Sequence, residues 1–283
     1  MKTIKNLIEK IHEAVRDIDQ NNLGIAFSGG VDSSTLAVTC KDLKKKTILL
    51  TVGFSSRRDI EISEEVSEKL GLPLLFEVIS LEELEEGIKS VLNVIKFDRL
   101  VLLENSVCFY YVFKIASQQG IETVLSANGM DELFCGYDLY RKYVDDEKRM
   151  KEIMGLLVET ARRDKAEIDK VAALWNVNYI CPFLSDRFVD FAIKIPMQYK
   201  IKGEDDKLRK HILREAALKM GVPKSAALRR KKAFQYSSGI HKSIAKLART
   251  RGFTKGRAKA LGYSGEIEAY LKTFYKTEGS MRK

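Results

Sequence analysis

The segment Phe27–Ser34 carries the clearest chemistry in this chain, and it reads F-S-G-G-V-D-S-S. An apolar stretch, 23–27, precedes it and a helix-forming stretch follows it. A strand, a glycine turn and a helix N-terminus in this order form a phosphate cradle, because unpaired backbone N–H groups and the helix dipole face the ligand. Gly29 and Gly30 let the backbone approach a phosphate without a Cβ in the way. We therefore predict phosphate binding by Ser28, Gly29, Gly30, Ser33 and Ser34.

Asp32 is the one acidic member of this turn. A carboxylate beside a phosphate repels it unless a cation lies between them, and Mg²⁺ prefers carboxylate and phosphate oxygens as ligands. We therefore interpret Asp32 as a magnesium ligand. The alternative is an ordinary strand-to-helix turn with a serine cap.

A second segment, Ser126–Tyr137, also combines a strand end, a glycine and acidic residues, in the order S-A-N-G-M-D-E-L-F-C-G-Y. Asp131 could supply a second carboxylate to a magnesium ion held mainly by phosphate oxygens. The alternative is that Asp131 and Glu132 begin a helix, where acidic residues are favoured in any case. The residues alone leave both interpretations open.

A basic cluster, Arg229–Lys232, stands beside small residues that end at Gly239. A cation here could neutralise charge that builds up on a phosphorus centre or on a leaving pyrophosphate. The alternative is a solvated basic loop on the protein surface.

The elements that must position these residues follow from the apolar periodicity. It predicts helices over 4–19, 33–43, 59–70 and 104–119, a helix that Ser80 caps together with Glu83, and strands over 23–27, 47–52, 74–79 and 123–126. Strands that alternate with helices indicate an α/β fold, a Rossmann-like parallel sheet with helices on both faces. The strand pattern fades beyond about residue 145, so we expect a sheet domain over 1–145 and a helical part over 146–283 that packs on it and completes the site.

Ligands of open parallel sheets bind beyond the carboxyl ends of the strands. The turn at 28–34 follows the first predicted strand, and 126–137 follows the fourth. We therefore expect both segments on the same rim of the sheet, as two halves of one site.

Composition narrows the class of protein. No run of about 18 apolar residues occurs, so we expect no membrane span. The four cysteines are dispersed without a C-x-x-C pair, which argues against a zinc site or disulfide framework and favours buried thiols in a cytoplasmic protein.

The net charge is +10, but residues 200–283 hold 23 basic and 7 acidic residues. Such a basic part can contact nucleic acid, a membrane surface or an anionic substrate, or can be a solvated surface.

Three motifs in fixed order resemble one family. The run 28–34, S-G-G-V-D-S-S, resembles the PP-loop of the N-type ATP pyrophosphatases. The segment 126–137 resembles the second signature of the asparagine synthetase B family, S-G-E-G-x-D-E-L-F-x-G-Y. The blocks at 181–196, 211–216 and 229–239 resemble later blocks of the same family, whose fold is adenine nucleotide alpha hydrolase-like.

The resemblance implies an ATP-dependent, AMP-forming amide ligase. A carboxylate would attack the α-phosphorus of ATP, and ammonia or an amine would then displace AMP from the acyl-adenylate. By motif position, residues 28–34 would hold pyrophosphate and Mg²⁺, Asp131 would share the metal, and Val52 and Gly53 would lie near the adenine. Lys231 takes the place of the family's catalytic lysine, with Lys232 as the alternative if the register shifts by one.

Two departures from the family pattern bear on the substrates. The chain starts Met1-Lys2-Thr3, so we expect no glutaminase domain, and free ammonia, a separate glutaminase subunit or an amine-bearing substrate would supply the nitrogen. Asn128 stands where the family has Glu, close to the reacting substrate, so the carboxylate substrate need not be aspartate.

Two other functions stay open at this point. One is a tRNA-modifying ATP pyrophosphatase, which the basic residues 200–283 suggest. The other is a catalytically inactive nucleotide-binding subunit, which Asn128 suggests. The oligomeric state, a homodimer included, is also open.

Overall fold

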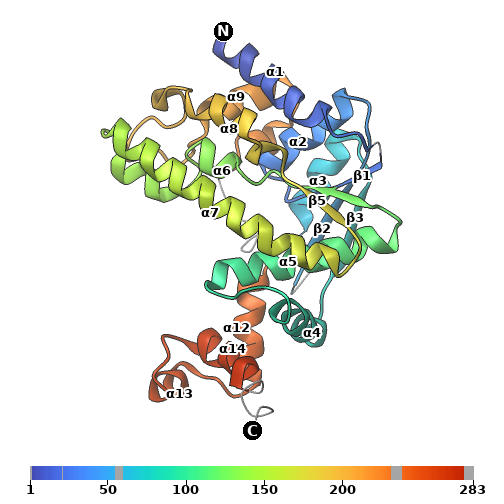
Figure 1. Cartoon of the computed structure of the whole chain (residues 1–283), viewed down its shortest axis with the longest axis vertical. Helices are drawn as coiled ribbons and strands as arrows, with labels where there is room; N and C mark the ends of the chain where they lie inside the picture. Colours follow the sequence, from blue (N-terminus) through green and yellow to red (C-terminus); the bar gives the residue numbers. More distant parts are fainter. Residues whose placement is uncertain (1, 21, 55–59, 231–237, 277–283) are drawn as a thin grey trace.

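A computed structural model describes residues 2–20, 22–54, 60–230 and 238–276. Its centre is a sheet of five parallel strands in the order β3-β2-β1-β4-β5 (Figure 1). The strands are β1 (Asn22–Ala26), β2 (Lys46–Gly53), β3 (Leu74–Val78), β4 (Thr123–Leu125) and β5 (Asn178–Ile180). The predicted α/β fold with a parallel sheet is therefore confirmed.

Helices cover both faces of this sheet (Figure 1). One face carries α5 (Leu100–Gln118), flanked by α4 (Leu81–Leu92) and α7 (Glu147–Ala173). The other face carries α2 (Val31–Asp42), against which α1 (Lys2–Arg16), α9 (His211–Lys219) and α10 (Lys224–Ala227) pack. The remaining α-helices in the described part of the chain are α3 (Glu61–Leu70), α6 (Met130–Leu133), α8 (Asp186–Ile193), α12 (Ile240–Thr250), α13 (Lys255–Ala260) and α14 (Glu266–Lys276). The last three project from the end of the molecule opposite α1.

Local sequence signals set several element boundaries. Ser80 caps α4 through a capping box, in which its hydroxyl accepts from Glu83 N (3.2 Å) and the Glu83 carboxylate accepts from Ser80 N (2.9 Å). Gly71 ends α3 with a left-handed φ of 63°. Helix α2 begins at Val31, two residues before the predicted start, so Asp32 belongs to its first turn.

One prediction about the sheet was wrong. We expected no strand beyond residue 145, yet Asn178–Ile180 forms β5 and pairs in parallel with β4. A strand of three residues is too short for its alternation to stand out in a sequence. The boundary between the two predicted domains stays a prediction.

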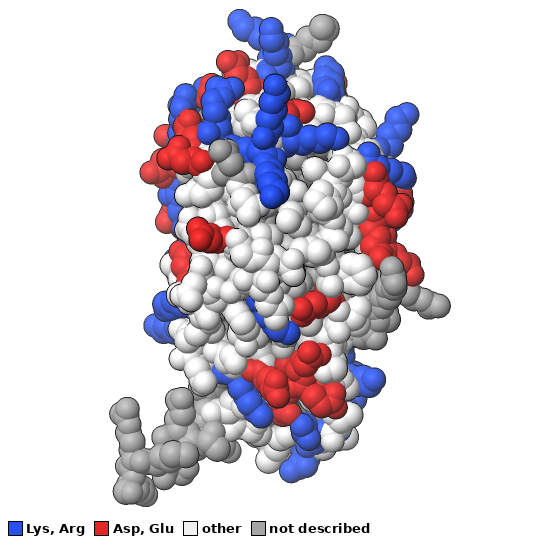
Figure 2. All heavy atoms as spheres, turned by 90° about the vertical axis from the view of Figure 1, so that its right-hand side faces the viewer, with Lys and Arg blue, Asp and Glu red and all other residues white. Residues whose placement is uncertain are grey.

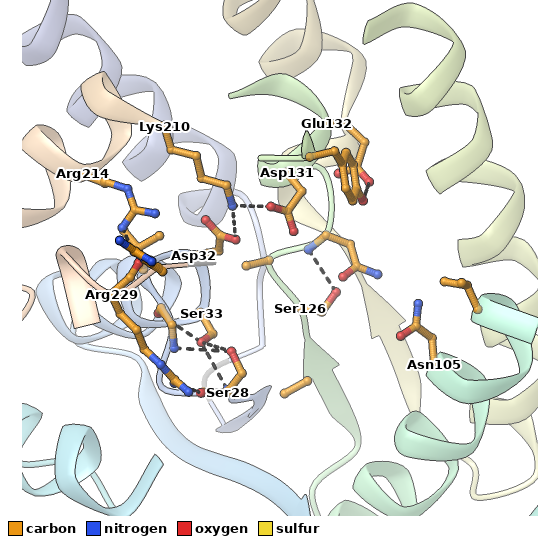
Figure 3. A pocket seen from close by; sticks show the side chains of 18 of the residues that line it. Ser28, Asp32, Ser33, Asn105, Ser126, Asp131, Glu132, Lys210, Arg214 and Arg229 are labelled. Atoms are coloured by element: carbon orange, nitrogen blue, oxygen red, sulfur yellow. Dashed lines mark hydrogen bonds and ion pairs between the residues drawn. The ribbon is translucent and has the colours of Figure 1, made fainter. Parts of the chain in front are cut away.

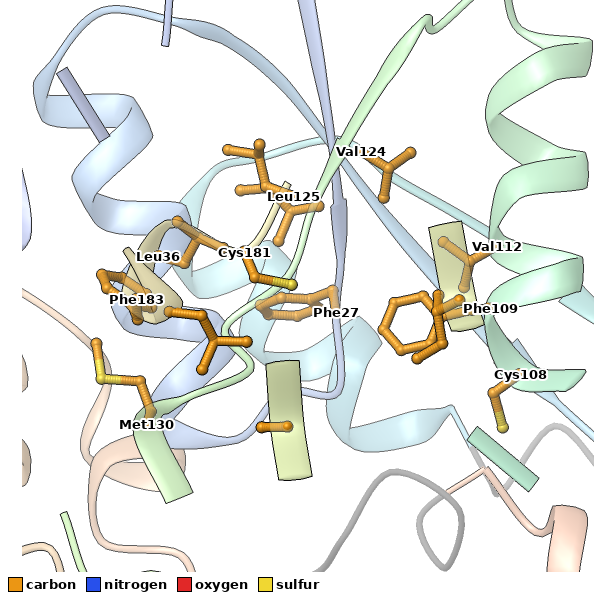
Figure 4. Packing of buried hydrophobic residues seen from close by; sticks show 14 of the residues in the cluster. Phe27, Leu36, Cys108, Phe109, Val112, Val124, Leu125, Met130, Cys181 and Phe183 are labelled. Atoms are coloured by element: carbon orange, nitrogen blue, oxygen red, sulfur yellow. The ribbon is translucent and has the colours of Figure 1, made fainter. Parts of the chain in front are cut away.

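The phosphate turn rests on the centre of the core. Phe27, the residue before the turn, is fully buried and lies between Phe109 of α5 and Cys181 (Figure 4). All four cysteines are free and buried, as predicted. Helix α5 is long and apolar enough to cross a membrane by composition, but 67% of that stretch is buried inside the protein, as in a core helix.

The basic residues of 200–283 are not all on the surface. Lys200, Arg209, Lys210 and Arg214 are each at most 6% exposed. On the face shown in Figure 2, Lys and Arg side chains gather toward the α1 end, and acidic groups interrupt the rest of the face. Part of the charge excess is therefore internal, and this face presents no continuous basic stripe.

Lys200 is a buried cation without a carboxylate partner among the described residues. Its Nζ donates to Ala192 O (2.7 Å) and lies 5.9 Å from the Phe134 ring centre. Burial lowers the pKa of Lys200 to about 8, whereas an unfolded chain would restore its usual value near 10.5. Between these values the unfolded state binds more protons, so stability rises with pH across the window from about 8 to 10.5.

We expect Lys200→Met to remove the increase of stability with pH that Lys200 causes. The variant should also be more stable than the wild type at pH 7, by up to roughly 3 kcal/mol. Ala192 O keeps a donor in Ile195 N (3.2 Å), so the substitution leaves this carbonyl satisfied. Urea unfolding of both proteins at pH 7, 8, 9 and 10 measures the effect. An unchanged slope of stability against pH would contradict the assignment.

Candidate active site

A cavity of about 190 Å³ opens at the rim of the sheet, beyond the carboxyl ends of β1 and β4. These two strands are neighbours at the point where the strand order reverses, which is where open α/β sheets bind ligands. The cavity wall comes from the turn after β1, the segment after β4, one face of α5 and the segments around α9 (Figure 3). The prediction that 28–34 and 126–137 lie on one rim is confirmed.

The turn after β1 has the shape of an anion cradle. Gly29 adopts a left-handed φ of 65°, and a Cβ there would lie 2.8 Å from Ile62 O, so only glycine fits. The Ser33 hydroxyl lies 3.3 Å from both Ser28 N and Ser28 Oγ, which keeps both hydroxyls beside the turn. These donors belong to the N-terminal end of α2, where the helix dipole favours an anion.

Lys210 joins the two halves of the site. Its Nζ lies 2.6 Å from Asp32 Oδ2 and 2.5 Å from Asp131 Oδ1 (Figure 3). Burial alone would lower the pKa of Lys210, but the charges of Asp131 and Asp32 outweigh it and raise the pKa, so the ammonium stays protonated. The two carboxylates are therefore held together by a buried cation.

An unusual backbone conformation and a neighbouring hydrogen-bond network hold Lys210 in this contact. Arg209 and Lys210 both adopt left-handed φ values, 51° and 56°, which non-glycine residues rarely do. Arg209 Nε donates to Gly136 O (3.1 Å), and its guanidinium pairs with Asp138 (2.5 Å). A Cβ on Gly136 would lie 2.0 Å from Asp131 Oδ1, so glycine makes room for the ion pair. Such strained residues persist only where their surroundings hold them.

Arg214 of α9 organises the segments on both sides of that helix. Its buried guanidinium donates to four backbone carbonyls, those of Leu208 (2.8 Å), Arg209 (2.7 Å), Ala227 (2.6 Å) and Arg229 (2.8 Å). Burial lowers the pKa of Arg214. The segments that carry Lys210 and Arg229 are thereby fixed relative to each other, and Arg229 Nη1 reaches Ser28 O at 3.4 Å.

The donor set fits a magnesium ion that also binds phosphate. Asp32 Oδ1 is buried and accepts no hydrogen bond from a described residue. Among the described residues, no group of three or more His, Cys, Asp and Glu side chains could hold a metal by itself. Two carboxylates beside an anion cradle suit Mg²⁺, which binds through one or two carboxylates plus substrate phosphates.

The predicted site residues are only partly gathered in this cavity. Ser28, Gly30, Asp32, Ser33 and Asp131 line it. Ser34 is fully buried beneath the turn, and Gly29, Val52 and Gly53 are not among the lining residues. Lys231 and Lys232 lie outside the described residues. The binding and catalytic roles proposed for all of these residues, those that line the cavity included, stay predictions.

Lys210 and Arg214 also line the cavity, although the sequence alone did not indicate them as site residues. Arg214 lies inside the block 211–216 that resembles the family, and Lys210 directly precedes it. Arg229 and Arg230 belong to the basic cluster that we singled out, and both line the cavity. Asn105 of α5, which the sequence did not indicate, lies on the opposite side of the cavity from Arg229 (Figure 3).

Comparison of the sequence with known proteins identifies its family. The family model for asparagine synthase matches residues 6–167 and 142–264. The chain belongs to the asparagine synthase family. It is 31% identical to a putative glutamine-hydrolysing asparagine synthetase of Methanocaldococcus jannaschii, over 90% of this chain and 52% of that protein. It is 27% identical to asparagine synthetase B of Escherichia coli, over 82% of this chain and 45% of that protein.

This member of the asparagine synthase family spans about half the length of these relatives. Among solved structures, an NMN synthetase from Francisella tularensis is similar at 15% identity with a TM-score of 0.44, over all of this chain and 95% of that one.

Proposed function

We propose that the protein is an ATP-dependent, AMP-forming amide ligase that activates a small carboxylic acid. A carboxylate oxygen attacks the α-phosphorus of ATP, the bond from that phosphorus to the β-phosphate oxygen breaks, and pyrophosphate leaves. The nitrogen of ammonia or an amine then attacks the acyl carbon of the adenylate, loses a proton, and AMP leaves. The family supports this class of reaction.

The observation that carries the proposal is the meeting of Asp32, Asp131 and Lys210 beside the glycine turn. This arrangement suits a leaving pyrophosphate, because it offers anion donors and places for both a metal and a fixed cation. Asp32 and Asp131 would hold Mg²⁺, and that ion would neutralise the phosphate oxygens when bound.

The protein's own residues have separate tasks in this scheme. The Ser28 and Ser33 hydroxyls and the backbone of the turn bind the β- and γ-phosphates. Lys210 and Arg229 stabilise the negative charge that develops on the leaving group, and Lys231 is proposed to act at the reacting phosphorus. Preorganised donors of this kind act without having to reorganise as the charge develops.

The test is pyrophosphate release from ATP in the presence of Mg²⁺, ammonium and a panel of carboxylic acids. We expect acid-dependent pyrophosphate and AMP in equal amounts. Asp32→Ala should lower the rate by on the order of 10²-fold or more, because it removes a metal ligand and leaves Lys210 without one of its partners.

Asp42→Asn is the matched control, since Asp42 is exposed at the other end of the same helix. It should leave the rate unchanged. Release of ADP and phosphate instead of AMP and pyrophosphate would overturn the proposal, and so would an Asp32→Ala protein with full activity.

A further inference from the structure

The C-terminal helices frame a groove that is larger than the active-site cavity. Its volume is about 1030 Å³, and its lining comes from α12, α14, the start of α13 and the start of α5. It lies toward the end of the molecule opposite α1 (Figure 1). The described residues that line this groove all differ from those that line the active-site cavity. The groove is therefore a separate feature, which the proposed ligase chemistry does not use.

A row of cationic side chains follows one face of α12. Lys242, Lys246 and Arg249 recur at spacings of four and three residues, so they lie on the same side of the helix, and all three line the groove. Lys255 at the start of α13 and Lys272 of α14 add two further cations to the lining. Like charges this close together repel each other, and an anionic partner would relieve that repulsion.

The carboxylates of the groove have partners of their own. They are Asp98, Glu266 and Glu268. Asp98 lies 3.3 Å from Arg99 Nε, and Glu266 pairs with Arg249 at 3.7 Å. Glu268 accepts from Ser264 N (2.9 Å) and from Ser264 Oγ (2.5 Å). These three acids therefore do not form ion pairs with the lysines Lys242, Lys246 and Lys255.

The three lysines of α12 and α13 are left as the unmatched charges of this groove. Lys242, Lys246 and Lys255 are exposed, and none of them forms an ion pair with a described residue. The rest of the lining is largely apolar and includes Phe97, Leu100, Ala245, Ile267 and Leu271. Of these, Phe97 and Leu100 keep part of their surface exposed. The groove thus combines unpaired cations with an apolar lining.

The helices that form the groove are fixed to the body of the protein. The His241 Nδ1 atom, at the start of α12, lies 2.5 Å from Oε1 of the buried Glu104 of α5. The Tyr270 hydroxyl of α14 donates to Glu85 Oε1 of α4 (2.8 Å). A groove whose walls are already held in place loses little conformational freedom when a partner binds.

We propose that this groove binds an acidic amphipathic helix of a partner protein. Helices bind in grooves through side chains that recur on one face. A helix that lies along α12 can present carboxylates one turn apart, which is the spacing of Lys242 and Lys246. Its apolar side chains would contact Phe97 and Leu100. This inference goes beyond the proposed function and does not depend on it.

The acidic members of the lining favour a protein partner over a nucleic acid. A nucleic-acid backbone carries a charge at every nucleotide, so it would meet Asp98, Glu266 and Glu268 as well as the lysines. A peptide helix carries carboxylates only at certain positions. It can place them opposite the lysines and place neutral side chains beside the acids.

The experiment selects ligands for the full-length protein from a displayed library of helical peptides of about 18 residues. We expect the enriched peptides to carry Asp or Glu one turn apart, beside an apolar face. Fluorescence anisotropy with the best of them should give a Kd that the double variant Lys242→Glu, Lys246→Glu weakens by at least about tenfold. Wild-type binding should also weaken as salt rises from about 50 mM to about 500 mM.

The matched control is the double variant Lys219→Glu, Lys259→Glu. It makes the same change of charge at two exposed lysines outside the groove, on α9 and α13, and should keep the wild-type Kd. Circular dichroism checks that both double variants are folded. Pyrophosphate release should stay at the wild-type rate in the Lys242→Glu, Lys246→Glu protein, because neither lysine lines the active-site cavity.

Several results would overturn the proposal. They are a failure to enrich any peptide, enrichment of basic peptides, and a Kd that both double variants change equally. Tighter binding of an oligouridine of about 20 nucleotides, lost in the Lys242→Glu, Lys246→Glu protein, would assign the groove to nucleic acid instead. A dimer in light scattering that the same variant dissociates would assign it to a second copy of this chain.

Discussion

Replacement of Lys210 by methionine is expected to lower the rate of pyrophosphate release by on the order of 10²- to 10³-fold. Methionine keeps the length and much of the apolar stem but removes the ammonium that pairs with Asp32 and Asp131. Two carboxylates would then face each other in a partly buried site, and the leaving group would lose a fixed cation. Steady-state kinetics with saturating ATP measures the loss.

The matched control is Lys219→Met, the same substitution at an exposed position in the last turn of α9. We expect it to retain wild-type kinetics. Because Lys210 is buried, the far-UV circular dichroism and melting temperature of both variants must be compared. A folded Lys210→Met protein with more than half of the wild-type rate would remove Lys210 from the site chemistry.

Replacement of Arg214 by alanine is expected to give the largest loss of stability, about 3–5 kcal/mol. The guanidinium supplies hydrogen bonds to four carbonyls in two chain segments, and alanine leaves these acceptors without their donor. Activity should also fall, because the same hydrogen bonds fix the segments that carry Lys210 and Arg229 relative to each other. The denaturation midpoint in urea, with an unchanged m-value, reports the loss.

Two further variants make this prediction specific. Arg214→Lys keeps the positive charge but lacks the planar guanidinium group. Its denaturation midpoint in urea should therefore lie between those of the wild type and of Arg214→Ala. Arg187→Ala removes an exposed arginine that pairs with Glu13 at 2.9 Å, and it should shift the midpoint little because surface ion pairs contribute little. Equal shifts for the alanine variants at 187 and 214 would contradict the role given to Arg214.

The sequence predicted the parts of this fold that depend on strong local signals. Strands β1 to β4 and the capped helix α4 follow from apolar runs and from the Ser80–Glu83 pair, which act over a few residues. The sequence did not predict strand β5, because three residues show too little alternation. Pairing with β4 is what makes this segment a strand. Tertiary context, which no local pattern contains, places it in the sheet.

The same distinction between local signals and tertiary contacts applies to the residues of the candidate site. The glycine turn could be found because paired glycines and serines between a strand and a helix form a phosphate cradle, and Asp131 could be found because its segment resembles a signature of the family. Lys210 and Arg214 could not, because a lysine and an arginine in a basic stretch look like surface residues. Only the fold reveals that Lys210 meets two partly buried carboxylates and that Arg214 meets four backbone carbonyls. The position of Lys231 remains a prediction.

The site draws on the beginning, middle and end of the chain, since Asp32, Asp131 and Lys210 come from three distant segments. During synthesis, the glycine turn leaves the ribosome long before the lysine that completes it. A nascent chain that already has the first four strands therefore carries a phosphate cradle without its buried cation. If the proposed function holds, ATP activation waits until the segment around Arg214 has docked, and a truncated translation product lacks the complete site.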